Sequence, residues 1–305
     1  MIACSLPILA CSGLIFTSAL GIRLISGREE VMPSLGSGDA VAIIRVDGVI
    51  MSTSGPLDIS AANSRKIIEH VGAAAEDENV KAIVLAVNSP GGGVVATDLI
   101  YHALVSQPKP IVVSMGDLAA SGGYYVSVPA DWIIATPNTL TGSIGVVSEF
   151  ISIEGLMEKH GVEAVTIASG PRKDFGSPFR AMTDTEQTYW QELTNETYDA
   201  FVDIVVQGRN LSSETVRQIA DGRLYTGRQA LANGLVDAVG YENDAIAKAA
   251  DLAGIDGEPR ILEYRDDIAL QEILIGLVNH RALPSHAEVL SWLTPPTLEA
   301  RWVGP

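Results

Sequence analysis

Short apolar runs alternate with stretches of helical periodicity from residue 41 to residue 114, and this alternation constrains the fold more than any other feature. The apolar runs predict strands at 41–46, 81–87 and 111–114, and the patterns between them predict helices at 59–75 and 94–106. Strands that alternate with helices form a mostly parallel sheet with helices on its faces. We therefore predict an α/β fold whose ligands bind beyond the carboxyl ends of the strands.

The rest of the chain continues this pattern less regularly. It predicts strands at 132–135 and 164–168, a turn-rich segment at 139–145, an apolar run at 234–239, and helices at 154–160, 183–207, 213–220, 227–232 and 243–252. The long helix at 183–207 carries an apolar and aromatic stripe that suits a core or a subunit interface.

The sequence divides into four segments. We expect a transmembrane anchor or signal segment at 1–24, a linker at 25–40, the main domain at 41–252 and a C-terminal extension at 253–305. The apolar run 268–278 in the extension is too short to span a membrane. We interpret it as a helix packed on a neighbouring subunit, with a helix at the lipid surface as the alternative.

The amino-terminal segment carries no charged residue from Ile2 to Ile22. Such a run matches the roughly 20 residues of one membrane-spanning helix. We expect a retained single-pass anchor; cleavage after Ala19 and lipid modification of Cys11 are the alternatives. Basic residues follow the segment, and by the positive-inside rule they would leave the main domain in the cytoplasm.

Composition excludes several functions. The formal net charge is −17, from 20 basic and 37 acidic side chains, and a chain without concentrated basic residues does not suit nucleic acid. The two cysteines, Cys4 and Cys11, cannot form a zinc site, and the five histidines lack ligand spacing. We predict no metal, no cofactor and no nucleic-acid partner.

Ser121 lies in a loop of small residues directly after the apolar run 111–114. Glycines at 122 and 123 would let another backbone approach its hydroxyl closely. A helix that begins after Ser121 would also aim free N–H groups at negative charge forming there. The loop therefore suits a nucleophile, although a tight packing turn uses the same residue types.

Two other loops could complete an active site around this serine. Three glycines follow Pro90, and the N–H groups of Gly92 and Gly122 could stabilise an oxyanion. A serine also needs a base, and Lys173 stands on a loop with many Gly and Pro residues. A lysine acts as a base only when neutral, which burial favours, and the hydroxyl of Ser143 could orient its amine.

These motifs together resemble the signal peptide peptidases, a family of Ser-Lys serine proteases with the Clp/crotonase fold, in their short single-repeat form. The resemblance covers 41 to about 250 and rests on 88–93, 119–125, 136–146, the Lys173 loop and 220–230. It implies that Ser121 is the nucleophile and Lys173 the general base. It likewise implies an oxyanion hole at Gly92 and Gly122, with Ser143 contacting the lysine. Val146 stands where the related Clp protease has its catalytic histidine.

The resemblance implies further properties. Family members degrade signal peptides left in the cytoplasmic membrane, with the catalytic domain on the extracytoplasmic side, contrary to the charge rule. Short members form homo-oligomeric rings or domes, such as octamers, in which serine and lysine can come from neighbouring subunits. An extended apolar peptide should pair with the backbone of Gly91, Gly93 and Val94.

Two rival functions stay open. A crotonase-like enzyme would use the paired backbone donors on an acyl-CoA thioester, but it would leave Ser121 and Lys173 unexplained. A catalytically inactive membrane scaffold would keep the fold for oligomerisation and protein binding.

Overall fold

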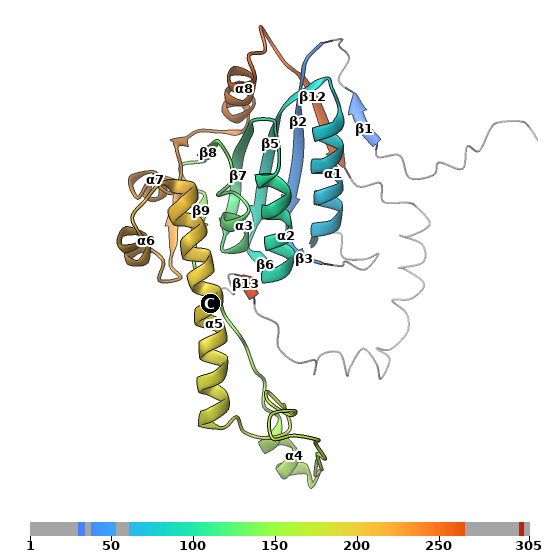
Figure 1. Cartoon of the computed structure of the whole chain (residues 1–305), viewed down its shortest axis with the longest axis vertical. Coiled ribbons are helices and arrows are strands. Elements are labelled where there is room, and N and C mark those ends of the chain that lie inside the picture. Colours follow the sequence, from blue (N-terminus) through green and yellow to red (C-terminus); the bar gives the residue numbers. More distant parts are fainter. Residues whose placement is uncertain (1–29, 34–37, 53–60, 266–298, 302–305) are drawn as a thin grey trace, which may run out of the picture.

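The main sheet of the computed structural model runs in the order β1-β12-β2-β5-β7-β8-β11 (Figure 1). The structure describes residues 30–33, 38–52, 61–265 and 299–301. The parallel strands are β2 (Ala40–Asp47), β5 (Val80–Ser89), β7 (Ile111–Ala120), β8 (Trp132–Ala135), β11 (Ala238–Val239) and β12 (Arg260–Arg265). Strand β1 (Glu30–Pro33) is antiparallel to β12. The predicted α/β fold with a mostly parallel sheet is confirmed.

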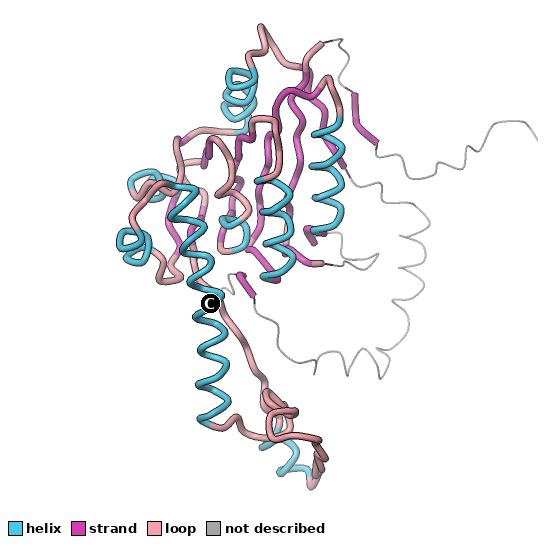
Figure 2. Tube along the Cα trace, in the orientation of Figure 1, coloured by secondary structure: helices cyan, strands magenta, loops and turns pink. Residues whose placement is uncertain are grey.

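Helices cover both faces of this sheet (Figures 1 and 2). Along β2, Val41 and Ile43 belong to a cluster with α8 (Glu242–Ala253), whereas Ala42 and Ile44 belong to the cluster with α1 (Ser64–Glu76) and α2 (Val94–Val105). Successive side chains on a strand point to opposite faces, so both sets are buried. Burial on both faces explains why these strands read as nearly continuous apolar runs.

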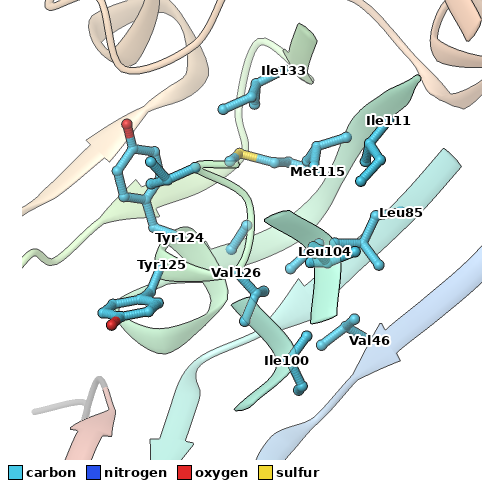
Figure 3. Close-up of a cluster of buried hydrophobic side chains, with 14 of the residues drawn as sticks. Val46, Leu85, Ile100, Leu104, Ile111, Met115, Tyr124, Tyr125, Val126 and Ile133 are labelled. Atoms are coloured by element: carbon cyan, nitrogen blue, oxygen red, sulfur yellow. The ribbon is translucent and has the colours of Figure 1, made fainter. Parts of the chain in front are cut away.

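The larger core cluster also holds the short helix α3 (Gly122–Tyr125). Figure 3 shows Tyr124, Tyr125 and Val126 among Ile100 and Met115. The hydroxyl of the fully buried Tyr124 donates to the carbonyl oxygen of Leu235 at 2.9 Å. A buried hydroxyl needs such a partner, so this bond fixes α3 against the core.

A small second sheet lies at the carboxyl ends of the main strands, in the order β13-β6-β3-β4. Its strands are β3 (Val49–Met51), β4 (Ala61–Asn63), β6 (Gly91–Gly93) and β13 (Glu299–Arg301). Two further short strands, β9 (Leu140–Gly142) and β10 (Leu224–Thr226), extend the main sheet beside the end of β7. The sequence pattern predicted none of these six strands.

Residues 148–195 project from the sheets and are called the arm here (Figure 1). The arm contains α4 (Glu154–His160) and most of the first half of α5 (Asp184–Arg209). Helix α5 packs on the core only through its carboxyl-terminal half, at Phe201, Val202 and Val205. Within the arm, every residue of which is described, only Glu186 is buried. The arm therefore has no hydrophobic core of its own.

The remaining helices, α6 (Ser213–Ile219) and α7 (Gly227–Ala232), lie close to their predicted positions. The predicted strand at 164–168 is wrong, because this segment has neither helix nor strand geometry. Val165 is 79% exposed and Ile167 is 94% exposed. An apolar run becomes a strand only with a neighbour to pair with, and the arm offers none.

The described residues include no helix with the length and apolarity that a membrane span requires. The expected anchor at 1–24 and the apolar run at 268–278 lie outside the described residues. Residues 260–265, assigned above to the C-terminal extension, form β12 of the main sheet.

Candidate active site

Ser121 occupies the turn between β7 and α3, and its backbone is strained. Its φ is 53° and its ψ is −116°, a region that residues with a side chain rarely adopt. Such strain persists only where the surrounding structure imposes it, and it concentrates at functional sites. The packing of β7 and α3 in the core supplies that constraint, so the turn presents Ser121 at the carboxyl end of a central strand.

Ser143 lies beside Ser121, at the end of a neighbouring strand. Strands β7 and β9 are parallel with Ala120 opposite Gly142, and each serine is the residue directly after its strand. The N–H of Ser121 donates to the carbonyl oxygen of Gly142 at 2.8 Å. Ser143 also has a positive φ, of 49°. The two hydroxyl-bearing residues are therefore held side by side by backbone geometry.

Both serines line a cavity of about 410 Å³. Ser121 is only 1% exposed, so a substrate would have to reach its hydroxyl through this cavity. One wall of the cavity is a single face of α5, formed by Gln191, Thr194, Asn195 and Tyr198 at helical spacing. The rest of the lining comes from two loops, at 144–147 and 220–222. Asp221, in the second loop, is paired with Arg223, whose hydrogen bond lowers the pKa of the carboxyl.

The Gly91–Gly93 loop lies against the serine turn, because α3 packs on β6. Ser89 is paired with Ala119 across β5 and β7, which brings the two loops to the same edge of the sheet. A Cβ on Gly123 would lie 2.6 Å from the carbonyl oxygen of Ser89. A Cβ on Gly92 would lie 2.0 Å from the carbonyl oxygen of Ile50. Only glycine fits at either position.

Gly122 is buried at the first position of α3. The first N–H groups of a helix have no acceptor within that helix, so the N–H of Gly122 is a suitable oxyanion donor. Gly92 lies in the adjoining strand β6, which packs on α3. The structure thus brings together Ser121, Ser143 and these two glycines.

Lys173 lies elsewhere, on an exposed loop of the arm. This loop adjoins α4 at the end of α5 that points away from the sheet (Figure 1). The residues that line the cavity of Ser121 come from α5 and from loops beside the sheet, and Lys173 is not among them. Within one chain, therefore, the predicted base is not beside the predicted nucleophile.

An ion-pair cluster holds the Lys173 loop to the start of α5. Arg180 donates to Asp174 at 2.9 Å and to Glu186 at 2.7 Å. The hydrogen bond from Arg180 is the main cause that lowers the pKa of Glu186 to about 2. Arg180 and Asp174 therefore stabilise the structure of this loop. Arg172, on the same loop, has its guanidinium 6.0 Å from the ring centre of Tyr189.

A second cavity, of about 550 Å³, adjoins the first and shares Val146, Val147, Gln191 and Thr194 with it. It runs between α5 and the first part of the arm, and Trp190 contributes a buried indole nitrogen with no hydrogen-bond partner among the described residues. Sequence analysis missed the α5 wall of both cavities. The spacing 191, 194, 195 and 198 could have identified it as one helix face.

A metal site is not apparent in the described part of the chain, where no three His, Cys, Asp or Glu side chains gather closely enough to hold an ion. The chemistry that this arrangement allows is attack by a serine hydroxyl, with backbone donors nearby for the developing negative charge.

The fold and the site define a serine hydrolase of the Clp type, and comparison with known proteins agrees. The model of the Clp protease family matches residues 46–141, and that of peptidase family S49 matches residues 103–256, about half of the chain. The chain belongs to peptidase family S49.

Three relatives illustrate the similarity. A provisionally named protease of Methanocaldococcus jannaschii is 45% identical over 62% of this chain and 61% of its own length. A protein of Enterococcus faecium, provisionally named signal peptide peptidase SppA, is 37% identical over 78% of this chain and 71% of its own length. Protease 4 of Salmonella typhi is 40% identical over 71% of this chain. The match spans only 35% of protease 4.

Family membership confirms the expected serine peptidase class and the resemblance to signal peptide peptidases. It favours a peptidase over the crotonase-like acyl-CoA alternative, which shares only the fold.

Proposed function

We propose that this chain is an endopeptidase that cleaves extended apolar peptides, including signal peptides left after secretion. Ser121 is the nucleophile, Lys173 the general base, and the N–H groups of Gly92 and Gly122 form the oxyanion hole. Ser143 orients the lysine amine. A catalytically inactive scaffold would have no use for this set of residues.

One observation carries the proposal: the strained turn that presents Ser121 beside Ser143 in a cavity. A serine held at φ 53° costs stability, about 1–3 kcal/mol, and a packing turn could avoid this cost with glycine. A catalytic role explains why the strained serine is kept: its hydroxyl attacks a peptide carbonyl from this position. Gly122 then follows directly at the amino end of α3, where its N–H can meet the oxyanion.

The position of Lys173 suggests that the active site is shared between copies of the chain. The arm exposes apolar side chains along its length, with Ile151, Leu156, Val165 and Ile167 all more than half exposed. Large exposed apolar surfaces mark interaction sites. We propose that the arm of one subunit packs on the next in a homo-oligomer such as a ring, and delivers Lys173 to that neighbour's Ser121. Burial at the interface would favour the neutral amine that a base requires.

The preferred substrate follows from the site and from the relatives. An extended peptide can pair by backbone hydrogen bonds beside Gly91, Gly93 and Val94, which requires no particular side chain. The cavity walls offer Ile144, Val146 and Val147 to apolar side chains. The relative from Enterococcus faecium carries the name of a signal peptide peptidase. A remnant signal peptide is apolar and, bound as an extended strand, would meet both requirements.

The test is hydrolysis of an apolar peptide ester by the full chain and by two variants, Ser121→Ala and Lys173→Ala. Each variant alone should lose activity by at least about 10³-fold. Mixing the two inactive variants and letting the subunits exchange should restore activity. Random assembly pairs an intact serine with a neighbour's intact lysine at about a quarter of the sites.

The outcomes are distinct. Full activity in either single variant removes that residue from the mechanism. Two inactive variants that stay inactive after confirmed subunit exchange would instead mean that each chain completes its own pair. Activity that rises only near pH 10, where a free lysine titrates, would contradict a buried base.

We also propose that the enzyme works at the cytoplasmic membrane, anchored by residues 1–24 with the main domain on the extracytoplasmic side. This rests on the uncharged segment from Ile2 to Ile22 and on the relatives. Protease digestion of sealed, right-side-out vesicles tests it. The main domain should be degraded without detergent, and complete protection would reverse the orientation.

A further inference from the structure

Four polar side chains of α5 line the cavity of about 410 Å³ beside the proposed nucleophile. Two of them already donate their hydroxyl hydrogens within the protein. The hydroxyl of Thr194 donates to a carbonyl oxygen one turn earlier in α5, at 2.8 Å, and that of Tyr198 donates to the carbonyl oxygen of Ala220 at 2.9 Å. The other two side chains are the amides of Gln191 and Asn195, which are therefore the groups of this wall that can serve a ligand.

The two amides are hydrogen-bonded to each other and keep further hydrogen-bonding capacity. Nε2 of Gln191 donates to Oδ1 of Asn195 at 2.8 Å, and neither side chain makes another hydrogen bond within the part of the chain that the structure describes. A primary amide has one acceptor oxygen and two N–H donors. Oε1 of Gln191 and the N–H groups of Asn195 are thus free, and both residues are exposed, so a ligand in the cavity can reach them.

An apolar peptide offers only its main chain to such groups. Each of its residues other than proline carries one N–H donor and one carbonyl acceptor, which match the free acceptor of Gln191 and the free donors of Asn195. The two side chains are one helical turn apart, about 6 Å along the axis. Peptide groups on one edge of an extended chain repeat at about 7 Å. The pair therefore suits two peptide groups on the same edge of one extended peptide.

The same wall continues into the second cavity, of about 550 Å³. Gln191 lines both cavities, and the α5 residues that line them extend from Gln187 to Tyr198. Eleven residues of helix rise by about 16 Å, which is the length of about five residues of extended chain. A peptide of ordinary length can thus lie along α5 with Gln191 and Asn195 near the middle of the contact.

The geometry points to a second set of substrate contacts: Gln191 accepts a hydrogen bond from a main-chain N–H of the bound peptide, and Asn195 donates one to a main-chain carbonyl oxygen. This inference rests on the proposed function, because it names groups that hold the same substrate. It accounts for a polar helix face in a site for apolar peptides, since main-chain contacts require no particular side chain. If this face were merely solvent-facing, the amide pair would only stabilise α5.

The test measures peptide binding separately from cleavage. The protein is the full chain carrying Ser121→Ala, and the probe is a fluorescein-labelled octapeptide of alternating leucine and alanine, followed by fluorescence anisotropy. In a set of probes, one main-chain N–H at a time is replaced by N–CH₃, which removes one donor. Gln191→Met removes the acceptor oxygen, whereas Gln191→Glu keeps one. The control is Glu192→Met, at the next residue of α5 and outside the lining of both cavities.

We expect N-methylation at one position of the probe to raise its Kd about tenfold, the effect of losing one hydrogen bond. The same N-methyl group should change the Kd by less than about twofold in Gln191→Met, and by about tenfold in Gln191→Glu and Glu192→Met, because only the first variant lacks the acceptor. Asn195→Asp, which has no N–H to donate, should weaken the binding of every probe by about tenfold.

Two results would overturn the inference. One is that Gln191→Met leaves the effect of every N-methyl group unchanged, and the other is that the Ser121→Ala protein binds none of the probes. An Asn195→Asp protein that binds the probes as tightly as its parent would remove Asn195 from the contact.

Turnover by the chain with an intact Ser121 separates this inference from the peptidase proposal. If the effect of an N-methyl group depends on Gln191 while this chain hydrolyses no peptide ester, the amide contacts stand and the peptidase proposal fails. If hydrolysis is normal and no N-methyl effect depends on Gln191, the peptidase stands and the amide contacts fail.

Discussion

Ser121 and Ser143 leave two adjacent parallel strands at the same level, and the N–H of Ser121 donates to the carbonyl oxygen of the residue before Ser143, at 2.8 Å. Both serines have positive φ angles. The distance between the two residues is therefore set by sheet pairing and not by side-chain packing. A change at either turn should be transmitted to the other through this one hydrogen bond.

The strain at Ser121 can be measured with two substitutions at one position. Ser121→Ala removes the hydroxyl but keeps a Cβ at φ 53°, whereas Ser121→Gly removes the cause of the strain as well. We expect both variants to be inactive, and the glycine variant to be more stable than the alanine variant by about 1 kcal/mol. Urea unfolding monitored by circular dichroism gives this difference. Equal stabilities would mean that the turn stores no strain.

Gly92 should tolerate no side chain. In Gly92→Ala the new Cβ would overlap the carbonyl oxygen of Ile50, so β6 must move and the oxyanion donor with it. We expect turnover of a peptide ester to fall by about 10²–10³-fold, the cost of losing one such donor. Gly72→Ala is the control: it lies in α1 with no atom within 4 Å of the new Cβ. That variant should keep its activity and gain about 0.5–1 kcal/mol. A fully active Gly92→Ala protein would remove Gly92 from the oxyanion hole.

Acid should loosen the Lys173 loop. Because Arg180 lowers the pKa of Glu186 from 4.5 to about 2, the folded arm favours the charged carboxylate. Its contribution to stability is complete above the ordinary pKa of about 4.5 and is lost as the pH falls from there towards 2. Pepsin cleavage of the arm, followed by mass spectrometry, should accelerate across this interval.

Glu186→Gln should make arm cleavage faster at pH 4.5 and remove much of its further increase on acidification. Glu158→Gln, an exposed position on α4, is the control and should behave like the unmodified chain. If Glu186→Gln and the unmodified chain respond to acid alike, the Arg180 ion pair does not hold the loop.

A second ion pair should matter for global stability. Arg209, whose side chain is only 8% exposed, binds Asp237 at the carboxyl end of α5, and Asp237 also accepts the N–H of Ile133. Asp237→Ala leaves a buried guanidinium without its partner, and we expect a loss of about 3–5 kcal/mol in the free energy of unfolding. Asp199→Ala breaks the exposed pair with Arg217 and should cost less than about 1 kcal/mol. Similar losses in the two variants, measured by urea unfolding, would contradict this.

The sequence predicted those elements whose own residue pattern identifies them, whatever their neighbours in the fold. Strands β2, β5 and β7 are buried on both faces, and their apolar runs reveal them without knowledge of the fold. Strand β6 could not be predicted, because glycine disfavours strands and Gly91–Gly93 is a strand only through its pairing with β3 and β13. The run at 164–168 failed for the opposite reason: it has strand composition but no partner.

The site was predicted unevenly for related reasons. The small residues around Ser121 are a local signal, and so are the glycines of the β6 loop. The α5 wall of the cavity depends on how a helix lies across the sheet, which periodicity does not give. Whether Lys173 meets Ser121 depends on parts of the chain that are distant in sequence. The proposed meeting of the two residues between neighbouring subunits stays a prediction.

The pairing of β2 with β12 has a consequence for biosynthesis. Arg45 on β2 binds Glu263 on β12 at 2.6 Å, and these residues are 218 positions apart. While the ribosome makes the intervening chain, one edge of β2 has no partner, and an unpaired apolar edge readily joins another strand. The sheet can close only when residue 265 has left the ribosome. We therefore expect the nascent chain to depend on holding chaperones until β12 has been made.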